Sequence, residues 1–343
     1  MSEPVTIKRG TEIELEIESL AYGGMGLARI ENFVIFVKHA IPGQRVSARI
    51  YKKRKGYAEA QVLETLVESP NAVDVCCKHY WICSKIQSLS YDEQIKEKSS
   101  QVEDAFVRLG GFLNFKLDKV QKANLIYHYR NKMEFTFSPN RWVLESEPEG
   151  VDKSFALGLH IPGRFDKILD IHNCHIQPEI GNKILAVARE VCLANPELRP
   201  YDPRSHIGFL RFLMLRFGVN TGDLMVNVVT SYHDIDKLST LTDILLEKFP
   251  GITSLVNNVN TRKADVAFGE YETLLYGKPF IQEKIGDLTF EISANSFFQT
   301  NTTQGEVLYK EVEEALKLRG DEIIYDLYCG TGTIGLYLSS SAK

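Results

Sequence analysis

The stretch Ile323-Ile324-Tyr325-Asp326-Leu327-Tyr328-Cys329-Gly330-Thr331-Gly332-Thr333-Ile334-Gly335-Leu336 lies close to the end of the chain. A β-branched and aromatic segment ends in an acid, two glycines follow two residues apart, and a new apolar pattern begins after them. This order predicts a strand, a tight loop and the start of a helix. Because glycine lacks a Cβ, such a loop can turn sharply and approach a ligand closely. We therefore expect it to bind a nucleotide-sized cofactor.

Two cofactors compete for this glycine loop. Gly330-x-Gly332-x-x-Gly335 matches the dinucleotide fingerprint, which by itself is a weak signal. Asp326-x-x-Cys329-Gly330-x-Gly332 is similar to the first motif of S-adenosylmethionine-dependent methyltransferases. A carboxylate after the strand repels a pyrophosphate but suits a ligand with an ammonium and a sulfonium group. We expect S-adenosylmethionine, with a dinucleotide or a purely structural turn as the alternatives.

The chain reaches Lys343 only a few residues into the helix expected after the loop. A cofactor-binding α/β domain contains several further βα units, including a second strand whose acid holds the ribose. We therefore expect residues 270–343 to be the start of an incomplete Rossmann-like α/β domain.

Length and composition limit the class of protein. A chain of 343 residues with 44% hydrophobic residues suffices for two or three domains with real cores. No apolar run approaches a membrane span, and the first residues do not resemble a signal peptide. Six scattered cysteines and no apolar heptads lead us to expect a cytoplasmic monomer. The net charge of -5 argues against a uniformly basic nucleic-acid binder but permits local basic faces.

Residues 1–66 are expected to form a small OB-like β-barrel. Residues 11–18 alternate strictly, which predicts a strand with Ile13, Leu15 and Ile17 on its buried face. About five short strands separated by glycine turns are typical of such a barrel. The basic run Lys52-Lys53-Arg54-Lys55 lies between two tyrosines. It is either a solvated hairpin tip or the basic, aromatic surface of a single-stranded nucleic-acid binder.

Residues 70–265 are expected to form a central α/β domain of mixed strand order. Residues 208–218 and 224–230 predict a hairpin that carries Arg211 and Arg216. A helix is expected to begin at Ser90. Its inward residues are expected to be Val102, Ala105, Phe106 and Leu109.

Two further segments carry residues typical of ligand sites. Cys76, Cys77 and Cys83 are clustered, but four well-placed ligands are needed for a metal or an iron–sulfur cluster, and the fourth would be the distant Cys174. Phe298 and Gln299 precede another expected helix. Such a pair is usually the edge of a core, although an aromatic ring and an amide also suit a cofactor or base pocket.

Taken together, these motifs resemble the RNA (uracil-5-)-methyltransferase family, and within it the 23S rRNA enzymes that carry a TRAM domain. The resemblance rests on the order of four features: the N-terminal barrel, the cysteine-rich knot, the strand Tyr129-Arg130-Asn131-Lys132-Met133-Glu134-Phe135, and Phe298-Gln299-Thr300-Asn301 followed by the glycine loop.

The resemblance implies that a uridine is flipped out of folded RNA and methylated at C5 through a covalent cysteine adduct. It implies contacts of S-adenosylmethionine with Gln299, Asp326, Tyr328, Gly330, Gly332 and Thr333. It also implies that the barrel and the central domain hold the RNA. The candidate RNA contacts are Lys52, Lys53, Arg54, Lys55, Arg130, Lys132, Arg211, Arg216 and Phe298.

The sequence departs from the family pattern at two places. The family's catalytic cysteine and base glutamate lie well after the glycine loop, so we expect both beyond Lys343 and no methyl transfer by this chain alone. The family's knot binds a [4Fe-4S] cluster. Cys77, Cys83 and Cys174 fit three of its ligands, but the residues after Cys83 lack the third cysteine of the knot. We therefore expect a collapsed, metal-free knot, with the cluster as the alternative.

Two other functions remain as alternatives. One is an RNA-binding module without catalysis. A protein that had lost catalysis should also have lost the sequence pattern of its cofactor loop, and here the pattern from Asp326 to Gly332 is intact. An NAD-linked oxidoreductase is favoured only by the glycine spacing. Between RNA classes, the TRAM-like barrel favours rRNA over tRNA.

Overall fold

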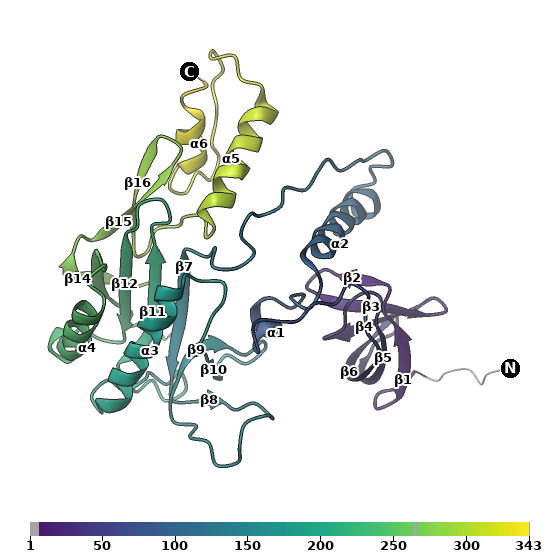
Figure 1. Ribbon diagram of the computed structural model, residues 1–343, viewed down its shortest axis with the longest axis horizontal. Coiled ribbons are helices and arrows are strands. Elements are labelled where there is room, and N and C mark those ends of the chain that lie inside the picture. Colours follow the sequence, from purple (N-terminus) through teal and green to yellow (C-terminus); the bar gives the residue numbers. More distant parts are fainter. Residues whose placement is uncertain (1–6, 264–265, 343) are drawn as a thin grey trace. The chain divides into compact units, whose positions relative to one another are not determined.

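The computed structural model describes residues 7–263 and 266–342 (Figure 1). The chain forms two compact units, Met1–Lys122 and Ala123–Lys343, and each is described here by itself. The boundary between them does not coincide with the end of the barrel that the sequence predicts at residue 66. The division into residues 1–66, 70–265 and 270–343 therefore remains a prediction.

The first unit is built on a six-stranded sheet in the order β1-β5-β6-β4-β3-β2. All neighbours are antiparallel except β4 and β6, which are parallel. The sequence predicted about five strands, and the structure has six among the described residues. The strands are β1 (Glu12–Glu16), β2 (Ser19–Ala21), β3 (Met25–Ile30), β4 (Phe33–Lys38), β5 (Arg45–Lys53) and β6 (Tyr57–Val67).

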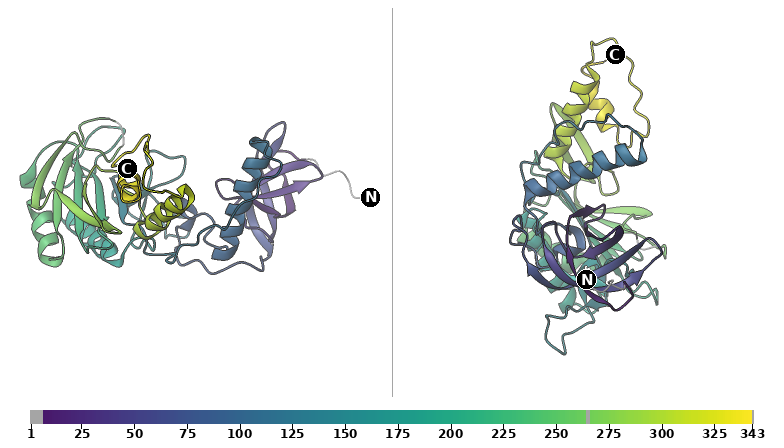
Figure 2. Two further views of the ribbon diagram at one scale, coloured as in Figure 1. Left: turned by 90° about the horizontal axis from the view of Figure 1, so that it is seen from above. Right: turned by 90° about the vertical axis from the view of Figure 1, so that its right-hand side faces the viewer.

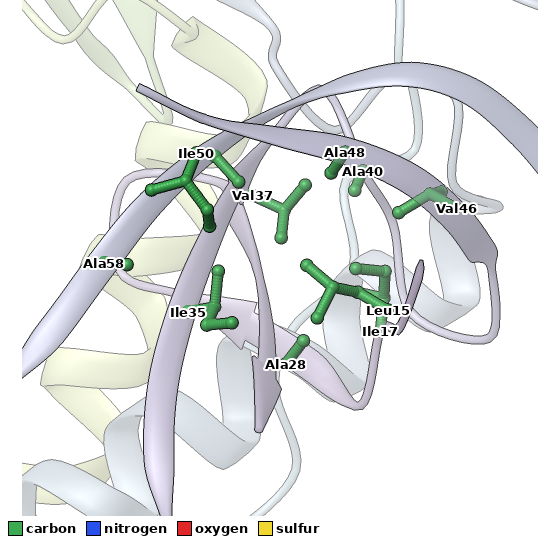
Figure 3. Packing of buried hydrophobic residues seen from close by; sticks show 11 residues of the cluster. Leu15, Ile17, Ala28, Ile35, Val37, Ala40, Val46, Ala48, Ile50 and Ala58 are labelled. Carbon is green, nitrogen blue, oxygen red and sulfur yellow. The ribbon is translucent and has the colours of Figure 1, made fainter. Parts of the chain in front are cut away.

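The core of this unit consists of small and β-branched side chains from the inner face of the strands (Figure 3). Leu15 and Ile17 are buried as their alternation predicts, and Ile13 packs against the edge of the cluster. Ala48 and Ala58 are fully buried, so the strands can approach closely at the centre. Burial of such side chains contributes roughly 25 cal/mol per Å² of apolar surface.

Helix α2 (Tyr91–Asp104) and a π-helical turn, η1 (Ala105–Leu109), follow the short helix α1 (Tyr80–Cys83). Figure 2 shows α2 lying along one side of the strands. The Glu97 carboxylate accepts a hydrogen bond from the Leu20 N–H at 2.8 Å, and Gln101 donates to the Leu20 carbonyl. A polar face of α2 therefore meets the barrel.

This arrangement contradicts the prediction of an inward apolar face on the helix. The apolar stripe points away from the strands because the polar face of α2 makes the contact with β2. The exposed residues of this stripe are Val102, Ala105, Phe106 and Leu109.

The second unit contains an eight-stranded mixed sheet in the order β14-β13-β12-β11-β7-β9-β10-β8. β11 and β12 form the predicted antiparallel hairpin, and β12 and β13 are parallel and joined through α4. The strands are β7 (Lys132–Ser138), β8 (Arg141–Trp142), β9 (Ala156–His160), β10 (Ile168–Asp170), β11 (Leu210–Phe217), β12 (Leu224–Thr230), β13 (Ser254–Val259) and β14 (Tyr271–Gly277).

Helices α3 (Glu179–Ala194) and α4 (Ile235–Lys248) pack next to each other in this unit (Figure 1). Every residue of β11, β12 and β13 is buried. Both faces of the central strands are therefore covered, which explains why their apolar residues do not alternate with exposed polar ones.

The C-terminal part of the second unit consists of the hairpin β15 (Phe280–Ile285) and β16 (Leu288–Ser293), then α5 (Thr302–Leu316) and α6 (Thr333–Leu338). A shared core contains Ile281, Phe290, Phe298 and Tyr309. The segment after β16 is linked to the large sheet by a chain of buried amides. Asn295 donates to Asn258 at 3.2 Å, and Asn258 donates to Asn227 at 3.2 Å.

The apolar segment before the glycine loop is not a strand in the structure, contrary to the prediction. Residues 321–326 pair with no sheet among the described residues. Ile323, Tyr325 and Leu327 are exposed. A buried parallel strand requires neighbours on both sides and layers on both faces, and the described residues surround this segment with neither.

Across residues 7–263 and 266–342, no helix is both long enough and apolar enough to span a membrane.

Candidate functional site

The glycine loop before α6 turns through left-handed backbone conformations. Gly330 and Gly332 have φ values of 58° and 72°. The Gly332 N–H donates to the Cys329 carbonyl at 2.8 Å and closes the turn. Tyr328 also has a positive φ of 62°, which is uncommon for a residue with a side chain, and its ring is fully exposed. The loop therefore presents backbone and one aromatic ring to its surroundings.

The space over the loop is open. A Cβ added at Gly330 would meet no atom within 4 Å, and one at Gly332 would meet only Leu336 Cδ1, at 3.9 Å. Glycine is therefore required here by the backbone conformation and not by internal packing. A ligand can approach this part of the chain as closely as the backbone allows.

Asp326 lies at the base of the loop and is half-buried. Its Oδ2 accepts a hydrogen bond from the Gly335 N–H at 3.1 Å. A Cβ at Gly335 would lie 3.2 Å from the same oxygen, so the absence of a side chain there allows the carboxylate to sit against the first turn of α6. The negative charge predicted for the cofactor site is thus held in place by the loop itself.

Two hydroxyl groups attach the loop to α5 and to the segment before it. Thr333 Oγ1 lies 2.8 Å from the buried Tyr309 hydroxyl, and Thr331 Oγ1 donates to the Phe297 carbonyl at 3.2 Å. The Thr333 hydroxyl is therefore used inside the core between α5 and α6, and the predicted contact of Thr333 with the cofactor stays a prediction.

The backbone of Gln299 is held by the buried side-chain amide of Asn131, the residue before β7. Asn131 Nδ2 donates to the Gln299 carbonyl and to Thr302 Oγ1, both at 2.8 Å, and the Asn131 N–H donates to the Thr300 carbonyl. Thr302 in turn donates to the buried carboxylate of Glu283 at 2.8 Å. These bonds fix the backbone of Gln299, and its place in the cofactor site together with the glycine loop stays a prediction.

The two neighbouring phenylalanines have opposite environments. Phe298 is 4% exposed and packs against Phe290, with ring centroids 5.9 Å apart, so its assignment as an RNA contact is wrong. Phe297 is 66% exposed beside the glycine loop and is the aromatic residue available to a ligand. The sequence could not separate the two, because both rings fit the edge of a core.

The basic run of the first unit lies on the β5–β6 hairpin among aromatic rings. Lys38 Nζ lies 4.5 Å from the centroid of the Tyr51 ring, Lys53 Nζ 5.7 Å from Phe33, and Lys52 Nζ 6.0 Å from Tyr57. Arg54 and Lys55 form the exposed tip. We call residues 51–57 together with Lys38 the basic hairpin surface.

Glu59 organises the base of this surface. It forms an ion pair with Lys52 and accepts a hydrogen bond from the Tyr51 hydroxyl at 2.8 Å. These bonds, that from Lys52 first, hold the pKa of Glu59 below its usual value. Burial and the bond to Glu59 raise the pKa of Tyr51. Lys52 is therefore partly neutralised, while Lys53, Arg54 and Lys55 remain exposed to an anionic partner.

The two arginines of β11 do not lie on a basic surface. Arg211 is 2% exposed, donates to the carbonyl groups of Asn260 and Arg262, and covers the Tyr201 ring at 4.4 Å. Arg216 is 4% exposed and donates to the Ala294 and Ser296 carbonyl groups. Burial lowers the pKa of Arg216 to about 10, so it is still charged at neutral pH. The prediction that these arginines contact phosphate is wrong, because both guanidinium groups are used inside the fold.

Arg130 and Lys132 lie at the start of β7 and are half-buried. Arg130 Nε donates to the Lys132 carbonyl at 3.0 Å, and Lys132 forms an ion pair with Glu134. Their role in RNA binding stays a prediction.

Comparison with known proteins places these features in a family. Residues 7–63 match the TRAM domain. An RNA methyltransferase of Porphyromonas gingivalis is 39% identical over 338 residues, which are 96% of this chain and 72% of that protein. One of Chlorobaculum tepidum is 42% identical over 309 residues, 88% of this chain and 64% of that protein. The chain belongs to this RNA methyltransferase family.

A solved structure has the same fold as the methyltransferase. It is the crystal structure of the Pyrococcus abyssi tRNA (uracil-54, C5)-methyltransferase in complex with S-adenosyl-L-homocysteine. The TM-score is 0.71 at 24% identity, over 96% of this chain and 71% of that one. At this identity the likeness shows a shared fold, and the relatives show the RNA methyltransferase family to which the resemblance of the sequence points.

The cysteine knot of the methyltransferase is held by Gln87, which is buried. Its Oε1 accepts from the Cys77 N–H at 3.1 Å and lies 3.6 Å from Cys76 Sγ. Burial raises the pKa of the Cys77 thiol. Cys83 is exposed on α1, and Cys174 is buried in the second unit. Within residues 7–263 and 266–342, no three His, Cys, Asp or Glu side chains are arranged to hold a metal ion.

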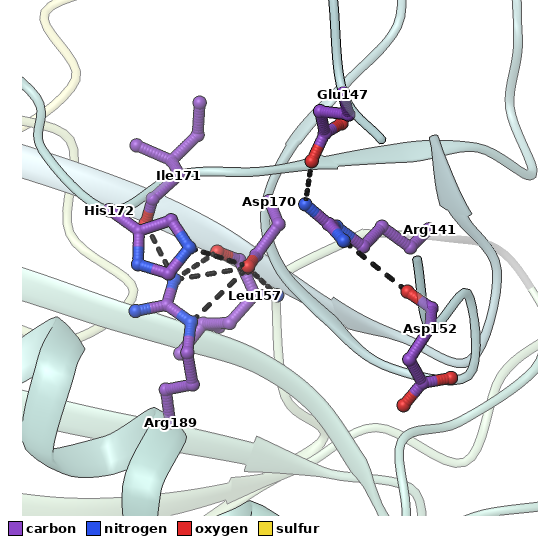
Figure 4. Close-up of polar contacts among 8 residues, drawn as sticks. All are labelled: Arg141, Glu147, Asp152, Leu157, Asp170, Ile171, His172 and Arg189. Carbon is purple, nitrogen blue, oxygen red and sulfur yellow. Dashed lines mark hydrogen bonds and ion pairs between the residues drawn. The ribbon is translucent and has the colours of Figure 1, made fainter. Parts of the chain in front are cut away.

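A second polar cluster of the methyltransferase has a structural role (Figure 4). Arg189 on α3 donates to Asp170 Oδ1 at 3.0 Å and to the carbonyl groups of Leu157 and Ile171. His172 Nε2 lies 3.1 Å from Asp170 Oδ2. Because the arginine and the aspartate are both buried, the pair fixes β9 and β10 to α3.

Proposed function

We propose that the methyltransferase transfers a methyl group from S-adenosylmethionine to C5 of a uridine in RNA. The observation that carries this proposal is the open, left-handed glycine loop at Gly330 and Gly332, where Thr331 bonds to the carbonyl of Phe297, two residues before Gln299. Membership of the RNA methyltransferase family supports the reaction class. The solved neighbour, named for uracil C5 and bound to S-adenosylhomocysteine, supports the base and the cofactor.

The residues around the loop fit S-adenosylmethionine. Asp326 offers a carboxylate, Tyr328 an exposed ring, and Gln299 a half-buried amide, while the Gly330 and Gly332 backbone lies open. The bound cofactor supplies an electrophilic methyl group. These side chains would hold and orient it, and the carboxylate favours a cationic ligand over a pyrophosphate.

The uridine requires a further activating group. A uracil C5 becomes a good nucleophile only after a thiolate has added to C6, and the base must leave its stack to be reached. Cys192 does not suit this role, because burial raises its pKa to about 12. Cys329 lies within the cofactor loop itself. We therefore propose a covalent cysteine adduct in the whole protein without assigning either of these cysteines to it.

The basic hairpin surface is the proposed contact with the RNA backbone. Lys53, Arg54 and Lys55 are exposed and can neutralise phosphate groups, and the nearby rings suit stacking with unpaired bases. Among RNA classes, 23S rRNA is the proposed substrate, from the family resemblance of the sequence. tRNA, named for the solved neighbour, is the competing substrate.

A methyl-transfer assay with the full-length protein tests the reaction and the substrate. Transcripts of 23S rRNA fragments and of tRNA are incubated with labelled S-adenosylmethionine, and 5-methyluridine is measured by mass spectrometry. We expect 5-methyluridine in rRNA. RNA that contains 5-fluorouridine should trap the protein covalently. C5 of this nucleotide carries fluorine in place of the proton that the general base of the protein must remove to release the adduct. A methylated product at another base would contradict the proposal.

The charge of Asp326 can be tested apart from its hydrogen bond. In Asp326→Asn the side-chain oxygen can still accept from the Gly335 N–H, but the negative charge is gone. We expect S-adenosylhomocysteine to bind at least tenfold more weakly, about 1.4 kcal/mol, as measured by calorimetry. Asp321→Asn, an exposed acid on the same segment, is the matched control. RNA binding without any cofactor binding by the wild type would favour the alternative of a non-catalytic RNA-binding module.

A further inference from the structure

A second cavity, of about 660 Å³, lies in the second unit away from the glycine loop. Its size is in the range typical of small-ligand sites. It forms where β12 and β13 end, at Thr230 and Val259, and where β11 and α4 begin. Because β12 and β13 are parallel and joined through α4, this is the edge at which open α/β sheets commonly bind ligands.

The two sites are at opposite ends of β11. The cavity is lined by Gly208 and Phe209, which precede the strand. Arg216, near the other end, donates to carbonyl groups of the segment that leads to Gln299. At about 3.3 Å per residue, the seven residues from 209 to 216 separate the two ends by roughly 23 Å. A ligand in this cavity is therefore not the cofactor of the glycine loop.

Tyr232 provides a fixed aromatic platform in the cavity. Its ring packs against the buried Phe209 ring with centroids 4.9 Å apart, and its hydroxyl accepts a hydrogen bond from Lys237 Nζ at 3.0 Å. The side chain is nevertheless 42% exposed. A ring that is packed on one face and exposed on the other loses little conformational freedom when a flat ligand stacks on it.

Positive charge surrounds this platform. Arg199, Lys237 and Lys263 line the cavity, against one acid, Glu197. Lys237 is held by Tyr232 and by Asp234, at 3.3 Å, and these bonds raise its pKa, so it stays protonated. Arg199 and Lys263 are exposed. An aromatic platform with exposed cations at its rim matches a base and its phosphate.

We propose that this Tyr232 cavity binds one unpaired nucleotide of the RNA, with the base stacked on Tyr232 and the phosphate near Arg199 and Lys263. The proposal rests on RNA as the substrate of the methyltransferase, but concerns a different nucleotide from the one that is methylated. The methyltransferase then requires two unpaired positions in the same RNA, one at each end of β11. A folded RNA with suitably spaced loops satisfies this requirement, and an isolated hairpin with one short loop does not.

Photo-crosslinking of the full-length protein tests the contact directly. The probe is a single-stranded oligoribonucleotide that contains 4-thiouridine, and crosslinked peptides are identified by mass spectrometry. We expect a crosslink to the peptide that contains Tyr232. Crosslinks confined to the basic hairpin surface and to the glycine-loop segment would overturn the proposal while leaving RNA methylation intact.

Affinity measurements with variants complete the test. Tyr232→Ala should weaken binding of the oligonucleotide at least fivefold, the effect of losing one base–aromatic stack. The double variant Arg199→Ala and Lys263→Ala should also weaken binding at least fivefold. Tyr232→Phe keeps the ring and should bind nearly as the wild type does. Tyr271→Ala and Lys248→Ala, exposed residues of the same unit, are matched controls and should change nothing.

Two readouts separate this site from the cofactor site and from a protein-binding site. Tyr232→Ala should bind S-adenosylhomocysteine as the wild type does. A weakened cofactor affinity would mean that the variant damages the fold, and would overturn the assignment of a separate site. Displacement of the oligonucleotide from the cavity by a polyglutamate peptide, but not by oligouridylate, would indicate a protein partner and also overturn it.

Discussion

The basic residues of the β5–β6 hairpin and those of β11 have the same chemistry and opposite environments. Lys53, Arg54 and Lys55 are exposed at the tip of a hairpin. Arg211 and Arg216 are almost fully buried and bind carbonyl groups. The difference follows from the layers around each strand: the hairpin tip extends into solvent, whereas β11 is covered on both faces.

Positive charge on a predicted strand does not by itself indicate a surface that binds nucleic acid. An arginine in a strand with both faces covered must direct its donors to buried acceptors, because an unpaired buried charge is too costly. The same side chain at a hairpin tip remains hydrated and available to phosphate. Four variants test this difference.

The largest effect is expected for Arg216→Met, which keeps the apolar length of the side chain but removes its donors. The Ala294 and Ser296 carbonyl groups lose their partner in a buried place, so we expect the free energy of unfolding to fall by about 3 kcal/mol. Urea unfolding measures it. Lys55→Met at the exposed tip is the control and should stay within about 0.5 kcal/mol. Equal stability of the two variants would contradict the buried role of Arg216.

A smaller effect is expected for the neutral buried group Asn131. Asn131→Ala removes the two side-chain hydrogen bonds to Gln299 and Thr302, and we expect a loss of about 2 kcal/mol in unfolding free energy. Asn124→Ala, exposed in the same unit, is the control. If both variants unfold at the same urea concentration, the Asn131 bonds do not position the Gln299 segment.

Next in size is the effect of charge on the basic hairpin surface. Replacing Lys52, Lys53 and Lys55 by alanine should weaken RNA binding about tenfold, or 1.4 kcal/mol, and reduce its dependence on salt. Fluorescence anisotropy at several salt concentrations measures both. The control carries alanine at the exposed lysines of the same unit, Lys98, Lys116 and Lys119. An unchanged salt dependence in the first variant would show that the hairpin tip does not meet phosphate.

The smallest effect is a pH dependence at the base of the same hairpin. The pKa of Glu59 is lowered by its hydrogen bonds from Lys52 and Tyr51. The Glu59 carboxylate therefore contributes fully to stability above the ordinary pKa of a glutamate, and this contribution is lost as the pH falls through the lowered pKa. Because the pair lies near the surface, we expect only a few tenths of a kcal/mol. The free energy of unfolding is measured at about pH 6 and pH 3, and Glu59→Gln should reduce the difference between the two values by this amount. If the difference is the same in the variant and the wild type, the ion pair contributes nothing to stability.

The sequence predicted most of the first unit, since its strands bury one face and alternation reveals that face. It also predicted the β11–β12 hairpin from the polar turn between two apolar runs. Alternation does not appear in β11, β12 and β13, and for that reason the burial of Arg211 and Arg216 could not be foreseen. The apolar stripe of α2 was misplaced because periodicity identifies a stripe but not the element that it faces.

The site was predicted in part. Glycine spacing and the preceding acid identified the loop and Asp326, because both depend on local backbone conformation. Phe298 is buried and Phe297 is exposed, the reverse of what was predicted for Phe298. Which ring is buried depends on a core assembled from β16 and α5, and the local sequence does not reveal that core. The Tyr232 cavity was missed altogether, since its lining comes from five separate segments that no motif connects.

The segment that follows β16 is attached to the large sheet at three separated points. Asn295 binds Asn258, the Ala294 and Ser296 carbonyl groups bind Arg216, and Gln299 and Thr300 bind Asn131. In the cofactor site that we propose, this segment is a fixed wall, because its displacement would break buried bonds to the rest of the unit. Residues 327–332 on the other side of the proposed site have an exposed backbone and are tied to this segment through the hydroxyl of Thr331, so we expect the cofactor to enter and leave there.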